Sequence, residues 1–109
     1  MNFLLIDDDE DVLECMRESL VCHGHEVMTA KNGFDGLALA ERGRFDVIVS
    51  DWQMPIMNGE EFLFAYGGHV PVIIASGANV VAPKARLILK KPYAAEDLIE
   101  AAEEMRMCR

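Results

Sequence analysis

Short apolar runs alternate along this chain with segments in which apolar residues recur at helical spacing. The apolar runs predict five strands, at residues 3–6, 25–30, 45–50, 70–76 and 85–90. We expect the second strand to be less buried than the other four. The segments of helical spacing predict helices from Asp9 to about Gly24, from Asn32 to about Gly43, over 60–66 and over 95–107.

Strands that alternate with helices are typical of a parallel sheet with helices on both faces. We therefore predict a doubly wound α/β fold of three layers, with a five-stranded parallel sheet in the middle. The length of 109 residues fits a single domain over residues 1–109. Apolar residues make up 51% of the chain and charged residues 27%, which is an ordinary globular balance.

The chain is acidic, with a net charge of -9. This sign argues against direct binding of nucleic acid or of an anionic membrane surface, because both require clustered Lys and Arg. It is compatible with binding a divalent cation.

The three cysteines, Cys15, Cys22 and Cys108, form no CxxC pair, so we expect no disulfide scaffold and a reducing, cytoplasmic location. Cys15 and Cys22 lie on one predicted helix, and we expect both to be small buried residues.

The opening segment, MNFLLID, has no basic leader and is unlike a signal peptide. No apolar run approaches the roughly 18 residues that span a membrane.

Polar side chains follow four of the predicted strands. Asp7 and Asp8 follow the first strand, Asp51 the third, Ser76 the fourth and Lys91 the fifth. Ligands of such sheets bind beyond the carboxyl ends of the strands, where these side chains are expected to converge. Each residue alone has a simpler explanation, as a helix cap, a turn residue or a solvated charge. Groups of complementary charge at four strand ends together favour a site.

Several carboxylates within a few ångströms repel one another, so that one of them retains a proton unless the charge is compensated. Mg²⁺ would remove this repulsion, because it prefers hard oxygen ligands and typically takes one or two carboxylates with water and phosphate oxygens. A carboxylate is also a competent nucleophile toward a phosphoryl group. In such chemistry a Lys and a hydroxyl hold the remaining phosphoryl oxygens. The pattern therefore indicates phosphoryl chemistry with Mg²⁺.

Four stretches of the sequence resemble the receiver domains of two-component response regulators, the chemotaxis-regulator-like family. These stretches are LLIDDDED, VIVSDWQMPIMNG, PVIIASG and LKKPY, in the family's order and over nearly the whole chain. The pattern D-x-x-M-P-x-x-x-G after a buried strand, combined with an early Asp pair and a late Lys-Pro, is highly specific. The resemblance implies the flavodoxin-like strand order 2-1-3-4-5.

The resemblance also implies roles for the acidic residues. Asp51 would accept a phosphoryl group from the phosphohistidine of a histidine kinase or phosphotransfer protein, and would thereby switch a surface that binds a downstream protein target. Mg²⁺ would be bound by Asp8, Asp51 and the main-chain carbonyl of Gln53, with Asp7 assisting through water. Formation and hydrolysis of the aspartyl phosphate would be self-catalysed, so the domain would not be an enzyme for separate substrates. The resemblance does not specify whether the domain forms a homodimer.

Further roles follow for residues at the fourth and fifth strands. Ser76 would hydrogen-bond the phosphoryl oxygens, and Lys91 would pair with the phosphoryl group, with a cis bond between Lys91 and Pro92. Two interpretations of Trp52 remain open: a position at the mouth of the site, or a surface-packed aromatic.

The sequence departs from the family in two places. Only nine residues, 77–85, lie between Ser76 and the fifth strand, whereas a parallel crossover takes a dozen or more. We therefore predict that the family's fourth helix, between the fourth and fifth strands, is stunted or missing, and that the third helix is short. Ile88 stands where the family often has Tyr or Phe, so the family's usual readout does not carry over.

Two alternative functions compete with the phosphorylation switch. Ile88 and the short connection are compatible with a degenerate receiver that acts as a phosphorylation-independent interaction module. A phosphatase with an aspartate nucleophile would need a second Asp two residues after Asp51, and Gln53 stands there instead.

Overall fold

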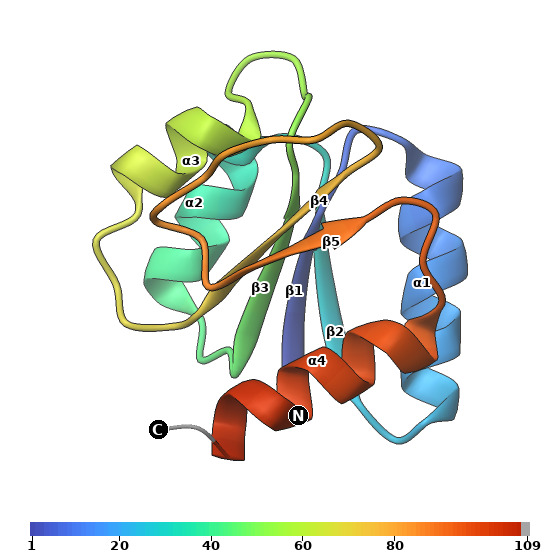
Figure 1. Cartoon of the computed structure of the whole chain (residues 1–109). Helices are drawn as coiled ribbons and strands as arrows, with labels where there is room; N and C mark the ends of the chain where they lie inside the picture. The colour runs from blue at the N-terminus through green and yellow to red at the C-terminus, as the bar shows by residue number, and fades with distance from the viewer. Residues whose placement is uncertain (108–109) are drawn as a thin grey trace.

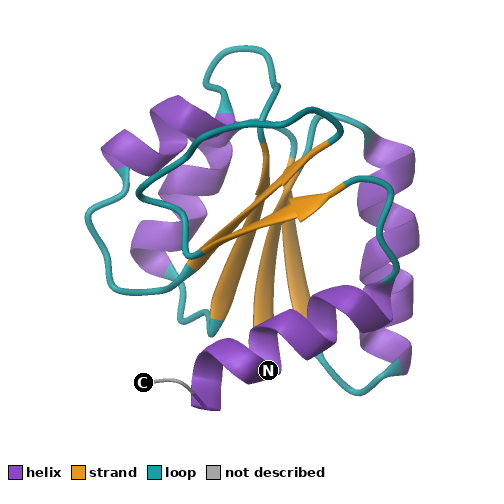
Figure 2. Ribbon diagram, in the orientation of Figure 1, coloured by secondary structure: helices purple, strands orange, loops and turns teal. Residues whose placement is uncertain are grey.

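The computed structural model describes residues 1–107 as a five-stranded parallel sheet between two layers of helices (Figures 1 and 2). The strands run in the order β2-β1-β3-β4-β5, and every neighbouring pair is parallel. The elements in chain order are β1 (Asn2–Ile6), α1 (Glu10–Cys22), β2 (Glu26–Ala30), α2 (Gly33–Arg42), β3 (Val47–Asp51), α3 (Gly59–Ala65), β4 (Val72–Ser76), β5 (Leu87–Lys90) and α4 (Ala95–Met107). The predicted doubly wound α/β fold with flavodoxin-like order is confirmed.

Each face of the sheet buries its own core, because successive side chains of a strand point to opposite faces. Helices α1 and α4 cover one face, and α2 and α3 cover the other (Figure 1). The first core includes Phe3, Leu5, Val49 and Leu98. The second core includes Leu4, Ile6, Ile48 and Phe62. Strands β1, β3 and β4 are therefore buried on both faces, as the apolar runs predict.

The segment between β4 and β5 contains no helix, which confirms the prediction of a missing helix there. We call residues 77–86 the connector; the label α4 in Figure 1 thus belongs to the C-terminal helix. The connector lies against the core under α2 and α3 through Val80, Ala82 and Ala85. Helix α3 has seven residues and is short, as expected.

The prediction that the fifth strand is buried is wrong. β5 lies at the edge of the sheet, and the side chains of Leu87 and Ile88 are each 38% exposed. The connector is an open chain without a helical face, so it covers β5 incompletely. An apolar run alone does not distinguish a central strand from an edge strand with one partner.

The acidic run after β1 ends in a capped helix. Asp9 is the N-cap of α1, and its carboxylate accepts hydrogen bonds from the main-chain N–H groups of Asp11 and Val12. Glu10 and Asp11 lie in the first turn, where the helix dipole favours negative charge. These three acids therefore stabilise the helix start, and only Asp7 and Asp8 remain to be explained by a site.

The prediction that Cys15 and Cys22 are buried is wrong, because both are exposed. Leu13 and Leu20 form the buried stripe of α1. Each cysteine follows a buried leucine by two positions, which is about 200° around the helix axis. Cys108 lies outside the described residues. Within residues 1–107, no helix combines the length and apolar character that a membrane crossing needs.

Candidate functional site

Side chains at the carboxyl ends of β1, β3, β4 and β5 line one hollow of about 620 Å³. We call it the acidic hollow; the predicted site residues in its lining are Asp7, Asp8, Asp51, Gln53, Ser76 and Lys91. The parallel register explains the convergence, since Asp51 pairs with Ala75 and Ser76 pairs with Lys90 across neighbouring strands. The structure thus brings together all six residues that the sequence singled out.

Three carboxylates face one another in the acidic hollow. Asp7, Asp8 and Asp51 each offer an oxygen, and these oxygens lie within 4.8 Å of one another. Asp7 is buried, and its Oδ1 is fixed by a hydrogen bond of 3.0 Å from the main-chain N–H of Asp9. Three hard oxygen donors at this spacing fit a small divalent cation such as Mg²⁺, which would also relieve their mutual repulsion.

Lys91 forms ion pairs with two of these carboxylates. Its Nζ lies 3.1 Å from Oδ1 of Asp51 and 3.2 Å from Oδ2 of Asp7. The main-chain N–H of Lys91 donates to the carbonyl of Ser76 at 2.9 Å, which fixes β5 against the end of β4. The Lys91–Pro92 bond is cis, as the resemblance implies. One ammonium therefore offsets part of the negative charge of the hollow.

Burial and the Asp51–Lys91 ion pair act in opposite directions on the pKa values of these two residues. Burial raises the pKa of the Asp51 carboxyl, and the hydrogen bond from Lys91 only partly offsets this effect. For Lys91, burial alone would lower the pKa, but the hydrogen bond to Asp51 and the charges of Asp7 and Asp51 raise it above the ordinary lysine value. Lys91 is therefore protonated at neutral pH. A further cation near the neighbouring Asp51 carboxyl would stabilise its charged form.

The two oxygens of Asp51 have different surroundings. Oδ1 accepts a hydrogen bond of 2.9 Å from the main-chain N–H of Trp52 in addition to its contact with Lys91. Among residues 1–107, Oδ2 accepts no hydrogen bond, so it is the oxygen left available for a ligand. Sequence reasoning missed the Trp52 donor, because a main-chain N–H leaves no signal in residue type.

The Trp52 side chain packs against the core under α2 and α3, which favours the packing interpretation of this residue.

Ser76 and Gln53 complete the rim of the hollow. Ser76 is buried, and its Oγ accepts a hydrogen bond of 3.1 Å from the main-chain N–H of Ala78. The hydroxyl proton of Ser76 remains available for an anion in the hollow. Gly77 and Ala78 also line the hollow, so the connector begins at the site.

The loop after Asp51 closes tightly at Gly59. The main-chain N–H of Gly59 donates to the carbonyl of Trp52 at 3.0 Å, and Asn58 caps α3 through a capping box with Glu61. A Cβ at position 59 would lie 2.5 Å from the carbonyl oxygen of Asp51 and 3.0 Å from Cα of Trp52. The glycine of the D-x-x-M-P-x-x-x-G pattern therefore lets α3 begin directly against the site strand.

Comparisons with known proteins identify the family. A family model described as the response regulator receiver domain matches residues 3–103. The response regulator receiver protein Anae109_2439 of Anaeromyxobacter sp. (strain Fw109-5) is 36% identical over 108 residues, which cover 90% of this chain and 45% of that protein. The response regulator MprA of Mycobacterium leprae is 31% identical, with 91% of this chain and 48% of MprA covered. The chain thus spans about half the length of these curated relatives.

Solved structures agree with this match over almost their whole length. The chemotaxis protein CheY4 of Vibrio cholerae is 31% identical, with a TM-score of 0.84 and with 94% of this chain and 96% of CheY4 covered. The receiver domain of the hybrid histidine kinase CckA is 28% identical, with a TM-score of 0.81 and coverages of 95% and 97%. The family model, the relatives and the fold agree, and the chain belongs to the response regulator receiver domains of two-component signalling.

Proposed function

We propose that Asp51 accepts a phosphoryl group from the phosphohistidine of a histidine kinase or phosphotransfer protein, in a reaction that requires Mg²⁺. Receiver domains are signalling modules with a phosphoacceptor role in two-component systems. The observation that carries the proposal for this chain is the meeting of Asp51 with Asp7, Asp8 and Lys91 in one hollow. This set combines a nucleophile, hard metal ligands and a fixed cation.

The proposed step transfers the phosphoryl group from nitrogen to oxygen. Oδ2 of Asp51 attacks phosphorus and forms a P–O bond, while the P–N bond breaks and its electron pair stays on the imidazole nitrogen, which takes up a proton. Lys91 and the Ser76 hydroxyl hold phosphoryl oxygens as charge moves onto them. Hydrolysis reverses the modification: a water oxygen attacks phosphorus, the P–O bond to Asp51 breaks, and the carboxylate and inorganic phosphate are released. The domain is thus changed by the reaction and has no separate substrate to turn over.

We assign the Mg²⁺ ligands to the carboxylates of Asp8 and Asp51 and the main-chain carbonyl of Gln53, with Asp7 acting through water. When bound, the ion would neutralise charge on the transferring phosphoryl group. The donor set supports this assignment, because all the side-chain donors are hard oxygens and Lys91 leaves their charge only partly offset.

Mass spectrometry after incubation with Mg²⁺ and a small phosphodonor tests the proposal. We expect the wild-type protein to gain the mass of one phosphoryl group, and we expect base to release it. Chelation of Mg²⁺ before incubation should prevent the gain. A protein that gains no mass would instead be the phosphorylation-independent interaction module, which Ile88 and the helix-free connector would then explain. Many turnovers of a soluble substrate per protein would contradict the self-catalysed scheme.

Mg²⁺ is expected to raise the melting temperature of the wild-type domain, because a ligand that binds only the folded state stabilises it. A concentration of 100 times Kd corresponds to about 2.7 kcal/mol, and for a domain of this size each kcal/mol shifts Tm by roughly 5 °C. Asp8→Ala should remove most of this shift in a thermal melt, since it deletes one of the three clustered carboxylates. Asp11→Ala, which changes an exposed acid of α1 outside the cluster, should keep it. Equal shifts for both variants would contradict the assigned site.

We also propose a cytoplasmic location and a protein target downstream. The exposed free thiols of Cys15 and Cys22 are compatible with a reducing compartment.

Ile88 pairs in register with Ile74 on the face covered by α2 and α3, and its side chain has no hydroxyl or ring. A readout through rotation of an aromatic side chain at this position is therefore not available, and the target must sense another part of the surface.

A further inference from the structure

One part of this acidic chain has basic residues but no acidic ones. The sequence contains no Asp or Glu between Glu61 and Glu96, although the net charge of the whole chain is -9. This stretch carries Lys84, Arg86, Lys90 and Lys91. Lys91 is engaged in the acidic hollow and Lys90 donates to Asn79. Within residues 1–107, no acidic side chain forms an ion pair with Lys84 or Arg86.

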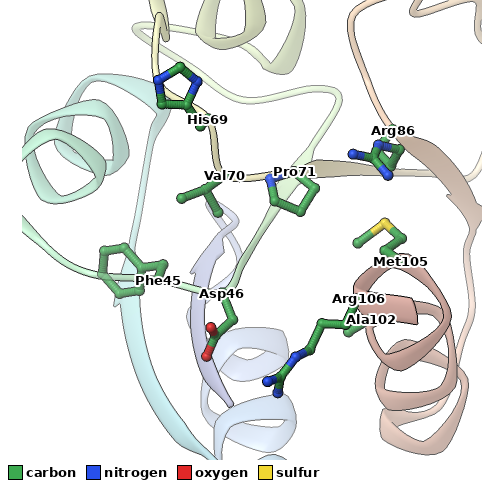
Figure 3. Close-up of a pocket in the computed structure, with 9 residues that line it drawn as sticks. All are labelled: Phe45, Asp46, His69, Val70, Pro71, Arg86, Ala102, Met105 and Arg106. Carbon is green, nitrogen blue, oxygen red and sulfur yellow. The ribbon is translucent and has the colours of Figure 1, made fainter. Parts of the chain in front are cut away.

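These unpaired cations border a groove at the amino ends of the strands. Two hollows of about 390 and 540 Å³ adjoin each other and share His69, Val70, Pro71 and Arg86. Lys84 lines the larger hollow, and Arg106 of α4 lines the smaller one. We call the two together the basic groove. Figure 3 shows the smaller hollow, with the Arg86 side chain directed over it from the start of β5.

The basic groove is remote from the phosphoacceptor. Pro71 and Arg86 immediately precede β4 and β5, whereas Asp51 ends β3. A five-residue strand is about 16 Å long, so the groove and the acidic hollow lie at opposite ends of the strands. We therefore expect substitutions in the groove to leave the contacts of Asp51 intact.

The floor of the groove is apolar and its borders are charged. Val70 and Pro71 are half-buried between the two hollows, and the connector supplies Pro83, Lys84 and Ala85 along one side. Lys84 also lies over the ring of Phe64, with its Nζ 4.6 Å from the ring centroid, and Phe64 is 68% exposed. Exposed aromatic surface thus continues beside the groove.

One acid, Asp46, occurs among the lining residues of the groove. Its Oδ2 accepts a hydrogen bond of 2.7 Å from the main-chain N–H of Asn2, so this oxygen is already engaged. The groove therefore keeps an excess of positive charge over an apolar floor, on a molecule that is otherwise negative.

We propose that the basic groove binds an acidic, amphipathic segment of a partner protein. Carboxylates of such a segment would pair with Arg86, Lys84 and Arg106, while its apolar side chains would cover Val70 and Pro71. A second copy of this chain fits less well, because it would bring its whole net charge of -9 toward the molecule, whereas a short segment brings only the carboxylates that pair with the cations of the groove. Nucleic acid also fits less well, because its backbone presents many phosphates to a molecule with few cations on this edge.

Fluorescence anisotropy with a labelled peptide of alternating Glu and Leu tests the proposal. We expect the wild-type protein to bind this peptide, and to bind it more weakly as salt is raised. Arg86→Glu should raise Kd at least about tenfold, because it places a like charge opposite the peptide. Arg86→Gln should have a smaller effect in the same direction. Arg86 is exposed, and circular dichroism would verify that both variants fold.

Two controls separate the groove from general charge. Lys31→Glu makes the same change of net charge at the carboxyl ends of the strands, directly after β2. It should change Kd by less than about twofold. A peptide with Gln in place of Glu should bind at least about tenfold more weakly than the Glu peptide. The proposal is overturned if wild type does not bind the Glu peptide at low salt, if Arg86→Glu and Lys31→Glu bind it alike, or if the Gln peptide binds equally well. Tighter, Arg86-dependent binding of a short DNA duplex would also overturn it and assign the groove to nucleic acid.

Discussion

Replacing Asp51 by Asn is expected to abolish the phosphoryl adduct while leaving the fold intact. The amide has no anionic oxygen to attack phosphorus, so we expect no mass gain after any time of incubation with Mg²⁺ and the phosphodonor. The amide oxygen can still accept the hydrogen bonds that Trp52 and Lys91 donate to Oδ1 in the wild-type protein. The substitution also removes a partly buried charge whose pKa is raised mainly by burial, so it should cost little stability.

Asp46→Asn provides the matched control for this experiment. Asp46 directly precedes β3 and Asp51 ends it, so both substitutions change one acid at an end of the same strand. We expect Asp46→Asn to form the adduct like the wild-type protein, because Asp46 is outside the acidic hollow. An adduct that persists on Asp51→Asn would show that another carboxylate is modified, and tandem mass spectrometry of the modified peptide would distinguish Asp7 from Asp8.

Replacing Gly59 by Ala is expected to lower the free energy of unfolding by at least about 2 kcal/mol, as overpacking of close contacts does. The added Cβ would meet the carbonyl oxygen of Asp51 at 2.5 Å and Cα of Trp52 at 3.0 Å. Both are main-chain atoms, so no flexible side chain can move aside, and the loop after Asp51 must shift. Urea titration followed by circular dichroism measures the change, and the rate of adduct formation should fall with it.

Gly67→Ala is the control for this substitution. A Cβ at position 67 would meet no atom within 4 Å, and the residue lies outside the left-handed region of the backbone. We expect the free energy of unfolding to stay the same or to rise by less than about 1 kcal/mol, because alanine restricts the unfolded chain. Equal losses for the two variants would contradict the steric argument for Gly59.

The candidate site could be predicted from the sequence because a parallel sheet brings its strand ends together. Once the apolar runs before Asp7, Asp51, Ser76 and Lys91 are interpreted as parallel strands, the fold places these four residues together at the carboxyl ends of the strands. The missing helix could also be predicted, because nine residues cannot build a full helical crossover. These inferences depend on chain connectivity and strand direction, which the sequence specifies well.

The features that could not be predicted depend on neighbours distant in sequence. The spacing of Cys15 and Cys22 indicates that they share a helix face, but only the packing of α1 on the sheet determines that this face is exposed. The exposure of β5 depends on how little of it the connector covers. The hydrogen bond from Trp52 to Asp51 depends on the course of the main chain after β3, which residue type does not encode.

The position of β5 has a consequence for how the protein avoids aggregation. An edge strand leaves one row of main-chain hydrogen-bonding groups open, and a chain with matching groups can extend the sheet from there. Here the edge is only four residues long, it carries the charged side chain of Lys90, and Pro92 follows shortly after it. Short length, a lysine and a nearby proline are the features that discourage strand addition. The loss of a covering helix thus opens the edge of the sheet without offering a long template for fibre growth.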